Sequence, residues 1–479
     1  MDHDQDSKPT VPHQSIQVVT SEKGNKSGLS SSKNWGEKAV VVTELRMQLK
    51  LAGPLIFTSF LQFSMQMISV MFVGHLGQVP LASASLATSF AGVTGFSLML
   101  GMGGALETFC GQAYGAELYQ MLGVYAQRAM TIFTLMGIPV SILWAFTGDI
   151  LAILKQDSQI SAGAGLYARW LIPSIFPYAL LQCQVRFLQA QKNTLPLVIS
   201  TGATTLCHAL VCWTLIFKLG LGNKGASLSL GISYWLNVLI LALYIMFSPT
   251  CQKTWKRFSE EALKNLYAFL RLGVPSAFMV CLEFWSYEFL VLLSAFLPNP
   301  KLETSMMSIS LNTISALFRI PVGAGKPNAA RLAVQVVLFL AVVGGLLTGM
   351  IAVAVRNVWG HMYTNDKELV TYLASVMPIL AAANFIDSIQ GVLAGCARGC
   401  GWQKTAAFTC LGAYYFVGLP TAIILTFVLH FGGKGLWIGI VGAVILQSTL
   451  LLLITLRTNW EQEATKARER VGGGSAIPS

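Results

Sequence analysis

Residues 51–457 consist largely of apolar runs that are long enough to cross a lipid bilayer. A helix needs roughly 20 apolar residues to span a hydrocarbon core about 30 Å thick. The runs are continuous and do not alternate every second residue, which argues against a transmembrane β-barrel. We therefore predict an all-α membrane protein with about 12 transmembrane helices and short loops. The predicted spans are residues 51–74, 81–110, 122–147, 163–189, 195–217, 221–247, 271–297, 302–322, 329–355, 368–394, 404–430 and 434–457.

Positive charge is concentrated on one side of the predicted bundle. Only 11% of the residues are charged, and the net charge is +11. The loops on the side that carries both tails hold twelve Lys or Arg residues, whereas the opposite loops hold seven. Because cytoplasmic loops are enriched in Lys and Arg, both termini are expected in the cytoplasm. This bias accounts for the net charge, so we expect no nucleic-acid partner.

An internal repeat divides the spans into two halves. Lys50-Leu51-Ala52-Gly53-Pro54 opens span 1, and the similar Arg271-Leu272-Gly273-Val274-Pro275 opens span 7. Gly222-Asn-Lys-Gly225 before span 6 matches Gly432-Gly-Lys-Gly435 before span 12. Such repeats are typical of transporters built around a central site. The predicted domains are a disordered cytoplasmic tail (1–48), an N-lobe of spans 1–6 (49–250), a cytoplasmic inter-lobe linker (251–270), a C-lobe of spans 7–12 (271–457) and a second cytoplasmic tail (458–479), which we also expect to be disordered.

Six motifs along the chain resemble one family of transporters. They are MFVGHLG (71–77), LETFCGQAYGA (106–116), RFLQAQ (186–191), CLEFWSYEFLVLLS (281–294), LETSMMSISLNT (302–313) and GAGKPNAARLAV (323–334). In this order they are similar to the MATE (multidrug and toxic compound extrusion) family, and in particular to its plant DETOXIFICATION-type transporters, over residues 45–460. The resemblance implies two pseudo-symmetric six-helix lobes. It also implies a proton-coupled antiporter that exports cationic or amphipathic organic compounds, xenobiotics or secondary metabolites, by alternating access. We expect a monomer in the plasma or vacuolar membrane that needs no cofactor.

Two acids within the C-lobe spans are the candidate proton-coupling residues. An ionisable side chain at bilayer depth is costly and usually functional. Glu283 lies near the middle of span 7, Asp387 lies in span 10 within NFIDSIQ, and both match acidic positions of the family. A buried carboxyl group favours its neutral form and a nearby cation favours its charged form, so a proton and an organic cation can compete for it. The alternative for each residue is a carboxyl group neutralised by a structural partner.

Glu288 is a weaker candidate for the substrate cavity. It follows Glu283 by five residues and therefore lies about 140° around the helix from it. The two side chains cannot share one narrow face of the helix. Glu288 is expected nearer the outer mouth of the cavity, where a structural role is favoured.

The N-lobe offers hydrogen-bonding groups where the C-lobe offers acids. Gln62 corresponds to Glu283 when Pro54 is aligned with Pro275, and Gln66 lies one turn further on. Some bacterial members of the family have an aspartate in span 1, which this chain lacks, so we expect proton coupling in the C-lobe. Sodium coupling remains an alternative. Glu107 and Gln112 lie at the cytoplasmic end of span 2, where we expect a role in gating or lobe packing.

Aromatic residues supply the candidate wall of the substrate cavity, which would suit flat and amphipathic solutes. A packing or lipid-facing role is the alternative for each of them. These residues are Phe284, Trp285, Tyr287, Tyr414 and Tyr415. Pro54 and Pro275 are predicted to begin equivalent spans, where proline costs little, and we assign them a role in gating or packing.

Other functional classes have less support. Gly220-x-Gly222-x-x-Gly225 fits a dinucleotide fingerprint, but it joins two spans and not a strand and a helix. The chain has no HExxH or GxSxG motif and no histidine cluster, so we expect no enzyme, and the nine cysteines lack zinc-ligand spacing. A lipid flippase of a related superfamily would share the fold but would need a more cationic cavity.

Span 8 is shorter than its counterpart in the repeat. Leu81 and Leu302 are equivalent in the register that aligns span 1 with span 7, but the Gly115-Ala116 pair that ends span 2 reappears at Gly323-Ala324, 13 residues early. Members of the family usually continue after an Ile-Pro pair such as residues 320–321 with a Gly-rich turn and a stretch like STRVSNELGAG. Thirteen residues form about 20 Å of helix, so we predict a weakened inward-facing gate. A transport-deficient MATE-like protein is therefore the alternative to an active transporter.

Overall fold

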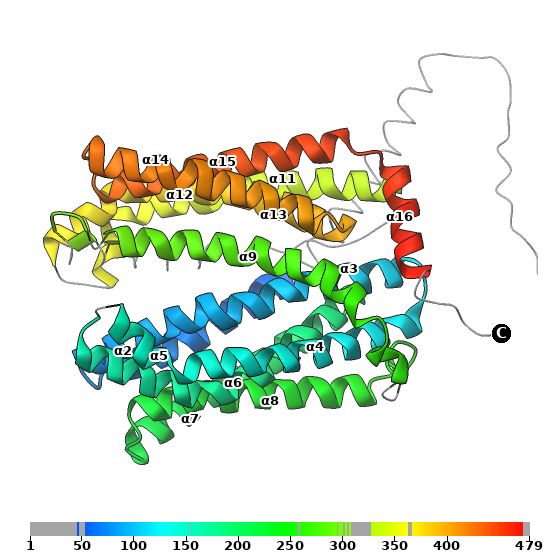
Figure 1. Cartoon of the computed structure of the whole chain (residues 1–479), viewed down its shortest axis with the longest axis horizontal. Coiled ribbons are helices and arrows are strands. Elements are labelled where there is room, and N and C mark those ends of the chain that lie inside the picture. Colours follow the sequence, from blue (N-terminus) through cyan, green and yellow to red (C-terminus); the bar gives the residue numbers. More distant parts are fainter. Residues whose placement is uncertain are drawn as a thin grey trace, which may run out of the picture. The chain divides into compact units, whose positions relative to one another are not determined.

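The computed structural model describes residues 46, 53–154, 156–256, 259–294, 296–299, 302–303, 306–307, 327–362 and 366–472. All of them belong to one unit of the chain, residues 44–479. Every regular element among them is a helix (Figure 1). The prediction of an all-α protein is confirmed.

The helices of the first half precede the inter-lobe linker. They are the helix Gly53–Gly74, α2 (Gln78–Ala91), η1 (Gly92–Phe96), α3 (Ser97–Gly115), α4 (Tyr119–Ala145), α5 (Thr147–Ile153), α6 (Ser158–Ala190), α7 (Leu195–Trp213), η2 (Thr214–Lys218) and α8 (Asn223–Phe247). The linker contains the short helix η3 (Glu260–Leu263). The second half comprises α9 (Leu266–Ser294), α11 (Pro327–Trp359), η4 (Gly360–Met362), α12 (Lys367–Cys400), α13 (Gln403–Leu411), η5 (Gly412–Gly418), α14 (Leu419–Ile423), η6 (Ile424–Val428), α15 (Gly433–Arg457) and α16 (Trp460–Gly472).

Ten helices within the described ranges are long and apolar enough to cross a membrane. They coincide with predicted spans 1, 2, 3, 5, 6, 7, 9, 10, 11 and 12. Span 4 is the 33-residue helix α6, which contains Arg169 and Arg186 and is therefore less apolar. Span 8, with the predicted shortening, falls outside the described residues apart from positions 302–303 and 306–307.

The internal repeat is visible in the backbone before spans 6 and 12. The π-helical segments η2 and η6 begin at Thr214 and Ile424, which are equivalent in the register that aligns Gly222 with Gly432. After η2 the backbone angle φ is positive at Gly220 (65°) and Gly222 (54°). After η6 it is positive at the equivalent positions, His430 (56°) and Gly432 (58°). Because glycine lacks the Cβ that disfavours positive φ, glycines occupy three of these four positions.

Hydrogen bonds tie the ends of equivalent spans together in both halves. In the first half, Asn223 Nδ2 at the start of α8 donates to the carbonyl of Pro80 in α2 (3.0 Å). In the second half, the Glu303 carboxylate accepts from the backbone N–H of Gly433 at the start of α15 (3.1 Å) and from the hydroxyl of Tyr372 (2.9 Å). A carboxylate at a helix N-terminus is stabilising, because it meets unpaired N–H groups and the positive end of the helix dipole. The start of span 8 is therefore anchored to the start of span 12.

Helix α9 connects the two hydrophobic cores. One buried cluster contains Phe269 and Ala277 from its first half together with residues of the first six spans. A second cluster contains Leu290 from its last turns together with residues of α12 and α15. Helix α9 begins at Leu266, so Pro275 lies inside the helix and does not begin it, which corrects the prediction from the repeat. The first half of this helix packs with the N-lobe.

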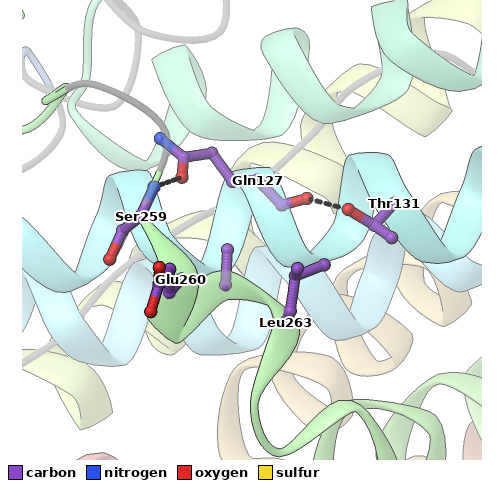
Figure 2. A pocket seen from close by; sticks show the side chains of 6 residues that line it. Gln127, Thr131, Ser259, Glu260 and Leu263 are labelled. Atoms are coloured by element: carbon purple, nitrogen blue, oxygen red, sulfur yellow. Dashed lines mark hydrogen bonds between the residues drawn. The ribbon is translucent and has the colours of Figure 1, made fainter.

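The inter-lobe linker is held against the first half of α4. Gln127 accepts a hydrogen bond from the backbone N–H of Ser259 (3.0 Å), and its own backbone carbonyl accepts from the Thr131 hydroxyl (3.1 Å), as Figure 2 shows. The buried guanidinium of Arg128 donates to the carbonyls of Glu261 (2.9 Å) and Ala262 (3.4 Å). These side chains satisfy backbone groups of the linker that lie outside any long helix. A pocket of about 240 Å³ remains between α4 and η3.

The second tail contains a helix, contrary to the prediction that it is disordered. Helix α16 follows α15 after two residues (Figure 1). Asn459 begins it, because its side-chain oxygen accepts from the backbone N–H groups of Glu461 (3.1 Å) and Gln462 (3.4 Å). This is the usual pairing at a helix N-cap. The helix is largely polar, so it contains no apolar run that would predict it from the sequence.

Candidate functional site

The two predicted coupling acids face the same interior region of the C-lobe. Asp387 on α12 is buried, with 2% of its surface exposed, whereas Glu283 on α9 is half-buried. Asp387 is near enough to Glu283 for their charges to interact, and Arg398 is near enough to act on Glu283. The hydroxyl of Tyr287 lies 3.5 Å from Asp387 Oδ2, which is long for a hydrogen bond between oxygens. Among the described residues, neither acid forms an ion pair with a Lys or Arg.

Buried polar atoms without partners surround Asp387. Its own Oδ1 makes no hydrogen bond with the described residues, and the same holds for Asn384 Oδ1, Gln390 Nε2 and the Tyr414 hydroxyl. Asn384 and Gln390 lie three residues before and after Asp387, and residues at this spacing neighbour one another on a helix. The sequence analysis missed both amides, although the spacing within NFIDSIQ contains the signal. Such a concentration of unpaired polar atoms is unusual, because buried polar groups are normally hydrogen-bonded.

The aromatic candidates differ in how they are packed. Tyr414 is fully buried and lies edge-on to Tyr287, with ring centroids 6.5 Å apart. Tyr415 is half-buried, and its hydroxyl donates to the Leu282 carbonyl (3.2 Å). Trp285 is held against the first half of the chain, because its indole N–H donates to the Val93 carbonyl in η1 (3.0 Å). Phe284 is 43% exposed.

Span 2 and the end of span 10 are joined by hydrogen bonds at the predicted cytoplasmic end. The hydroxyl of Thr108 on α3 donates to the Arg398 carbonyl (2.6 Å) and accepts from Gln403 Nε2 (2.7 Å). Gln112 Nε2 donates to the Gly399 carbonyl (3.1 Å). Glu107 Oε2 lies 3.7 Å from Arg398 Nε. Glu107 and Gln112 therefore both contact α12, where lobe packing or gating was predicted.

Small residues allow α3 to approach α9 closely in the same region. A Cβ at Gly101 would lie 2.6 Å from the Cα of Ala277, well inside van der Waals contact. The Ser276 hydroxyl donates to the Gly101 carbonyl (2.6 Å). Glycine at this position therefore brings the backbones of spans 2 and 7 together.

The N-lobe contains a buried hydrogen-bonded histidine that the sequence analysis did not single out. His208 on α7 is fully buried, and its ring nitrogens lie 2.9 Å from the Ser69 hydroxyl and 2.8 Å from the Ser233 hydroxyl. Ser233 donates to the Ser229 carbonyl (2.8 Å), so it must accept from His208 Nδ1. Nε2 then accepts from Ser69, which fits a neutral imidazole. This chain of hydrogen bonds joins the helix Gly53–Gly74 to α7 and α8.

The remaining predicted residues lie apart from these clusters. Gln62 is half-buried and Gln66 is exposed on the helix Gly53–Gly74. Glu288 is half-buried on α9, one and a half turns from Glu283. Pro54 lies in the first described turn of its helix, where its carbonyl accepts from the Thr58 hydroxyl (2.9 Å). No group of three metal-ligating side chains that could hold an ion occurs among the residues searched, which are those the structure describes.

Comparison with known proteins decides the family. The sequence profile of the MatE family matches residues 54–214 and 275–424. This chain belongs to the MatE family. Two relatives from Arabidopsis thaliana illustrate the relationship: Protein DETOXIFICATION 16 is 53% identical, with 92% of this chain and 94% of the relative covered, and Protein DETOXIFICATION 17 is 50% identical, with 90% and 94% covered.

Solved MATE structures match the fold along most of the chain. The crystal structure of the eukaryotic MATE transporter AtDTX14 matches with a TM-score of 0.87 and 44% sequence identity, over 90% of this chain and 99% of that one. An outward-facing multidrug resistance MATE transporter of the MOP superfamily matches with a TM-score of 0.73 and 16% identity, over 89% and 97%. The second likeness supports the fold alone. The resemblance and the MATE-like fold inferred from the sequence are confirmed, and this MATE protein is a multi-pass membrane transporter.

Proposed function

We propose that this chain is a proton-coupled antiporter that exports small organic cations or amphipathic compounds by alternating access. The observation that carries the proposal is that neither C-lobe acid is held in an ion pair among the described residues. Glu283 and Asp387 have no Lys or Arg ion pair among the described residues, and Asp387 Oδ1 is buried without a hydrogen bond. An acid that only stabilised the fold would be expected to have a fixed partner, because burying an unpaired charge is costly.

The two carboxyl groups can exchange a proton for a cation. Because Glu283 and Asp387 interact electrostatically, charging both would add like-charge repulsion. A proton on one of them removes that repulsion. A cationic substrate beside the half-buried Glu283 favours the charged form of the pair and so displaces the proton. Release of the cation on the other side of the membrane restores the protonated pair.

The other candidate residues are given supporting roles in the proposal. Tyr287, Tyr414 and Tyr415, with Phe284 and Trp285, would contact flat parts of the substrate. Gln62, Gln66 and Glu288 would contribute polar groups to the same cavity. Glu107 and Gln112 would close its cytoplasmic end, which agrees with their contacts to α12. We place both termini in the cytoplasm of a plasma or vacuolar membrane and expect a monomer, with an N-lobe over residues 49–250 and a C-lobe over residues 271–457.

The proposal is tested by transport in reconstituted vesicles. A fluorescent organic cation should accumulate when a pH gradient is imposed, and accumulation should stop when an ionophore abolishes that gradient. In the matched control, a sodium gradient at uniform pH replaces the pH gradient. Accumulation driven by sodium alone would contradict proton coupling, and transport that needs neither gradient would contradict antiport.

A transport-deficient protein is the second candidate, and two observations favour it. The repeat register places Gly323-Ala324 13 residues early in span 8. The match to Protein DETOXIFICATION 16 extends over 456 residues, whereas 92% of this 479-residue chain is about 441 residues. The difference means that about 15 aligned positions have no residue in this chain. Both observations are consistent with the loss of a short internal stretch.

A further inference from the structure

We propose that helix α16 is part of the gate at the predicted cytoplasmic end, with Arg470 as the positioning residue that holds spans 2 and 10 together. This inference rests on the proposed alternating access, because it assigns α16 to one of the two conformations. The residues involved lie outside the predicted proton and substrate site.

The start of α16 is fixed to the C-lobe. The Trp402 indole N–H donates to the Glu463 carboxylate (3.0 Å), and the rings of Trp402 and Trp460 lie 6.5 Å apart. A polar helix of 13 residues is marginal in water without tertiary contacts. These two contacts therefore account for its folding against the end of α12.

The C-terminal end of α16 contacts both span 2 (α3) and span 10 (α12) where these two helices meet. Arg470 Nη1 donates to the Cys400 carbonyl (3.2 Å), which closes α12, and to Gln112 Oε1 on α3 (3.3 Å). The last carbonyls of a helix have no partner within it, so Arg470 satisfies one that would otherwise be unpaired. A cationic side chain also interacts favourably with the negative end of the α12 dipole.

The local backbone makes room for the guanidinium of Arg470. Gly401 follows α12 with a φ of 82°, the left-handed conformation common after a helix. A Cβ at Gly401 would collide with the Arg470 guanidinium. Glycine is thus required here both for the backbone turn and for the close approach of Arg470.

Because Gln112 links Arg470 to α3, the contacts of α16 change when the predicted cytoplasmic ends of α3 and α12 separate. Gln112 uses its Nε2 for the Gly399 carbonyl on α12 and its Oε1 for Arg470. If α3 and α12 separate, Arg470 can stay with Cys400 or with Gln112 but not with both. The bond that is lost therefore stabilises the closed end selectively, and only such a state-dependent contact can shift a two-state equilibrium.

The test measures how often the contact opens. Thr108 is buried between α3 and α12, with 2% of its surface exposed. A cysteine is therefore introduced here (Thr108→Cys) in a variant that lacks the nine native cysteines. The rate at which a polar maleimide labels this cysteine reports how often α3 and α12 separate. Arg470→Ala in the full-length chain should raise that rate on the order of three- to tenfold, the worth of one ordinary hydrogen bond. Lys466→Ala is the matched control, because Lys466 carries the same charge on the same helix and its ion pair is with Glu463 within α16 (2.7 Å). It should leave the labelling rate unchanged.

A second variant separates gating from folding. Gln112→Met keeps α16 and the length of the side chain but loses both the acceptor for Arg470 and the donor to the Gly399 carbonyl, so it should raise the labelling rate by at least as large a factor. The double variant should show no more than the larger single effect, since the two residues share one bond. Equal labelling in Arg470→Ala and Lys466→Ala, or fully additive effects of the two gate variants, would overturn the proposal. Labelling needs no pH gradient, so the gate can be tested independently of proton coupling. A protein that does not couple protons but shows this labelling pattern would refute the proposed function and still support the role of α16 in the gate.

Discussion

Lengthening span 8 to match span 2 should restore or strengthen transport. The perturbation is an insertion of 13 residues that resemble the family stretch, placed between Pro321 and Gly323. From Leu81 to Gly115 span 2 has 35 residues, about 52 Å of helix, whereas the 22 residues from Leu302 to Gly323 would form only about 33 Å. Because Glu303 anchors one end of span 8 to Gly433, we expect the deficit of roughly 20 Å to fall at the opposite end.

The packing energy that a shortened span 8 would lose can be estimated from the equivalent part of span 2. Seven of the last twelve residues of α3 are buried, namely Gly104, Ala105, Leu106, Thr108, Phe109, Cys110 and Ala113. If each counterpart missing from span 8 contributed as little as an average interhelical hydrogen bond in a membrane, about 0.6 kcal/mol, together they would contribute about 4 kcal/mol. That corresponds to roughly a thousandfold in a two-state equilibrium. Tilting and local thinning of the bilayer absorb small mismatches, but they cannot replace a packing surface.

The assay compares the given and lengthened chains in the same vesicles. We expect the lengthened chain to transport an organic cation at least tenfold faster per molecule and to unfold at a higher temperature in detergent. An insertion of 13 Gly and Ser residues at the same place is the matched control and should restore neither property. If the given chain transports as fast as the lengthened one, the reasoning from the repeat is wrong.

Three further predictions follow from the same structure. Glu283→Gln should abolish gradient-driven transport while Glu288→Gln leaves most of it, because Glu283 belongs to the acid pair; equal loss in both variants would contradict the assignment. Gly101→Ala should lower the stability of the protein in detergent by about 1–3 kcal/mol through overpacking against Ala277. Gly111→Ala is the control, because its Cβ would meet open space and should leave stability unchanged. Thermal unfolding measures both variants. A cysteine placed in the linker 251–270 should react with an impermeant reagent only after the cell is permeabilised, and labelling in intact cells would reverse the predicted topology.

The sequence contained most of the fold because each span carries its own signal. An apolar run of about 20 residues specifies a membrane helix locally, and the repeat relates the two halves without any knowledge of their packing. Helix α16 was missed because it is polar and is held by single contacts such as that between Trp402 and Glu463. The start of α9 was misplaced because Arg271 and Pro275 resemble the beginning of a span, whereas the helix continues back to Leu266.

The candidate site was only partly accessible from the sequence. Glu283 and Asp387 stand out because acids are rare in apolar helices, and their identities alone make them candidates. The bond from the Trp285 indole N–H to the Val93 carbonyl could not be predicted, because it depends on how α9 packs against η1. The same is true of the Ser69–His208–Ser233 chain, whose three residues come from three different spans. Such contacts follow from tertiary structure and leave no local pattern.

Proton release on substrate binding is the measurement that tests the exchange at the acid pair most directly. The purified protein is placed in a weakly buffered detergent solution with a pH indicator, and a lipophilic organic cation is added while binding is followed by fluorescence. The account predicts that binding releases protons from the unmodified chain and releases none from Asp387→Asn, whether or not the shortened span 8 permits transport. Binding of the cation without proton release from the unmodified chain would contradict the proposal that proton and substrate compete for Glu283 and Asp387.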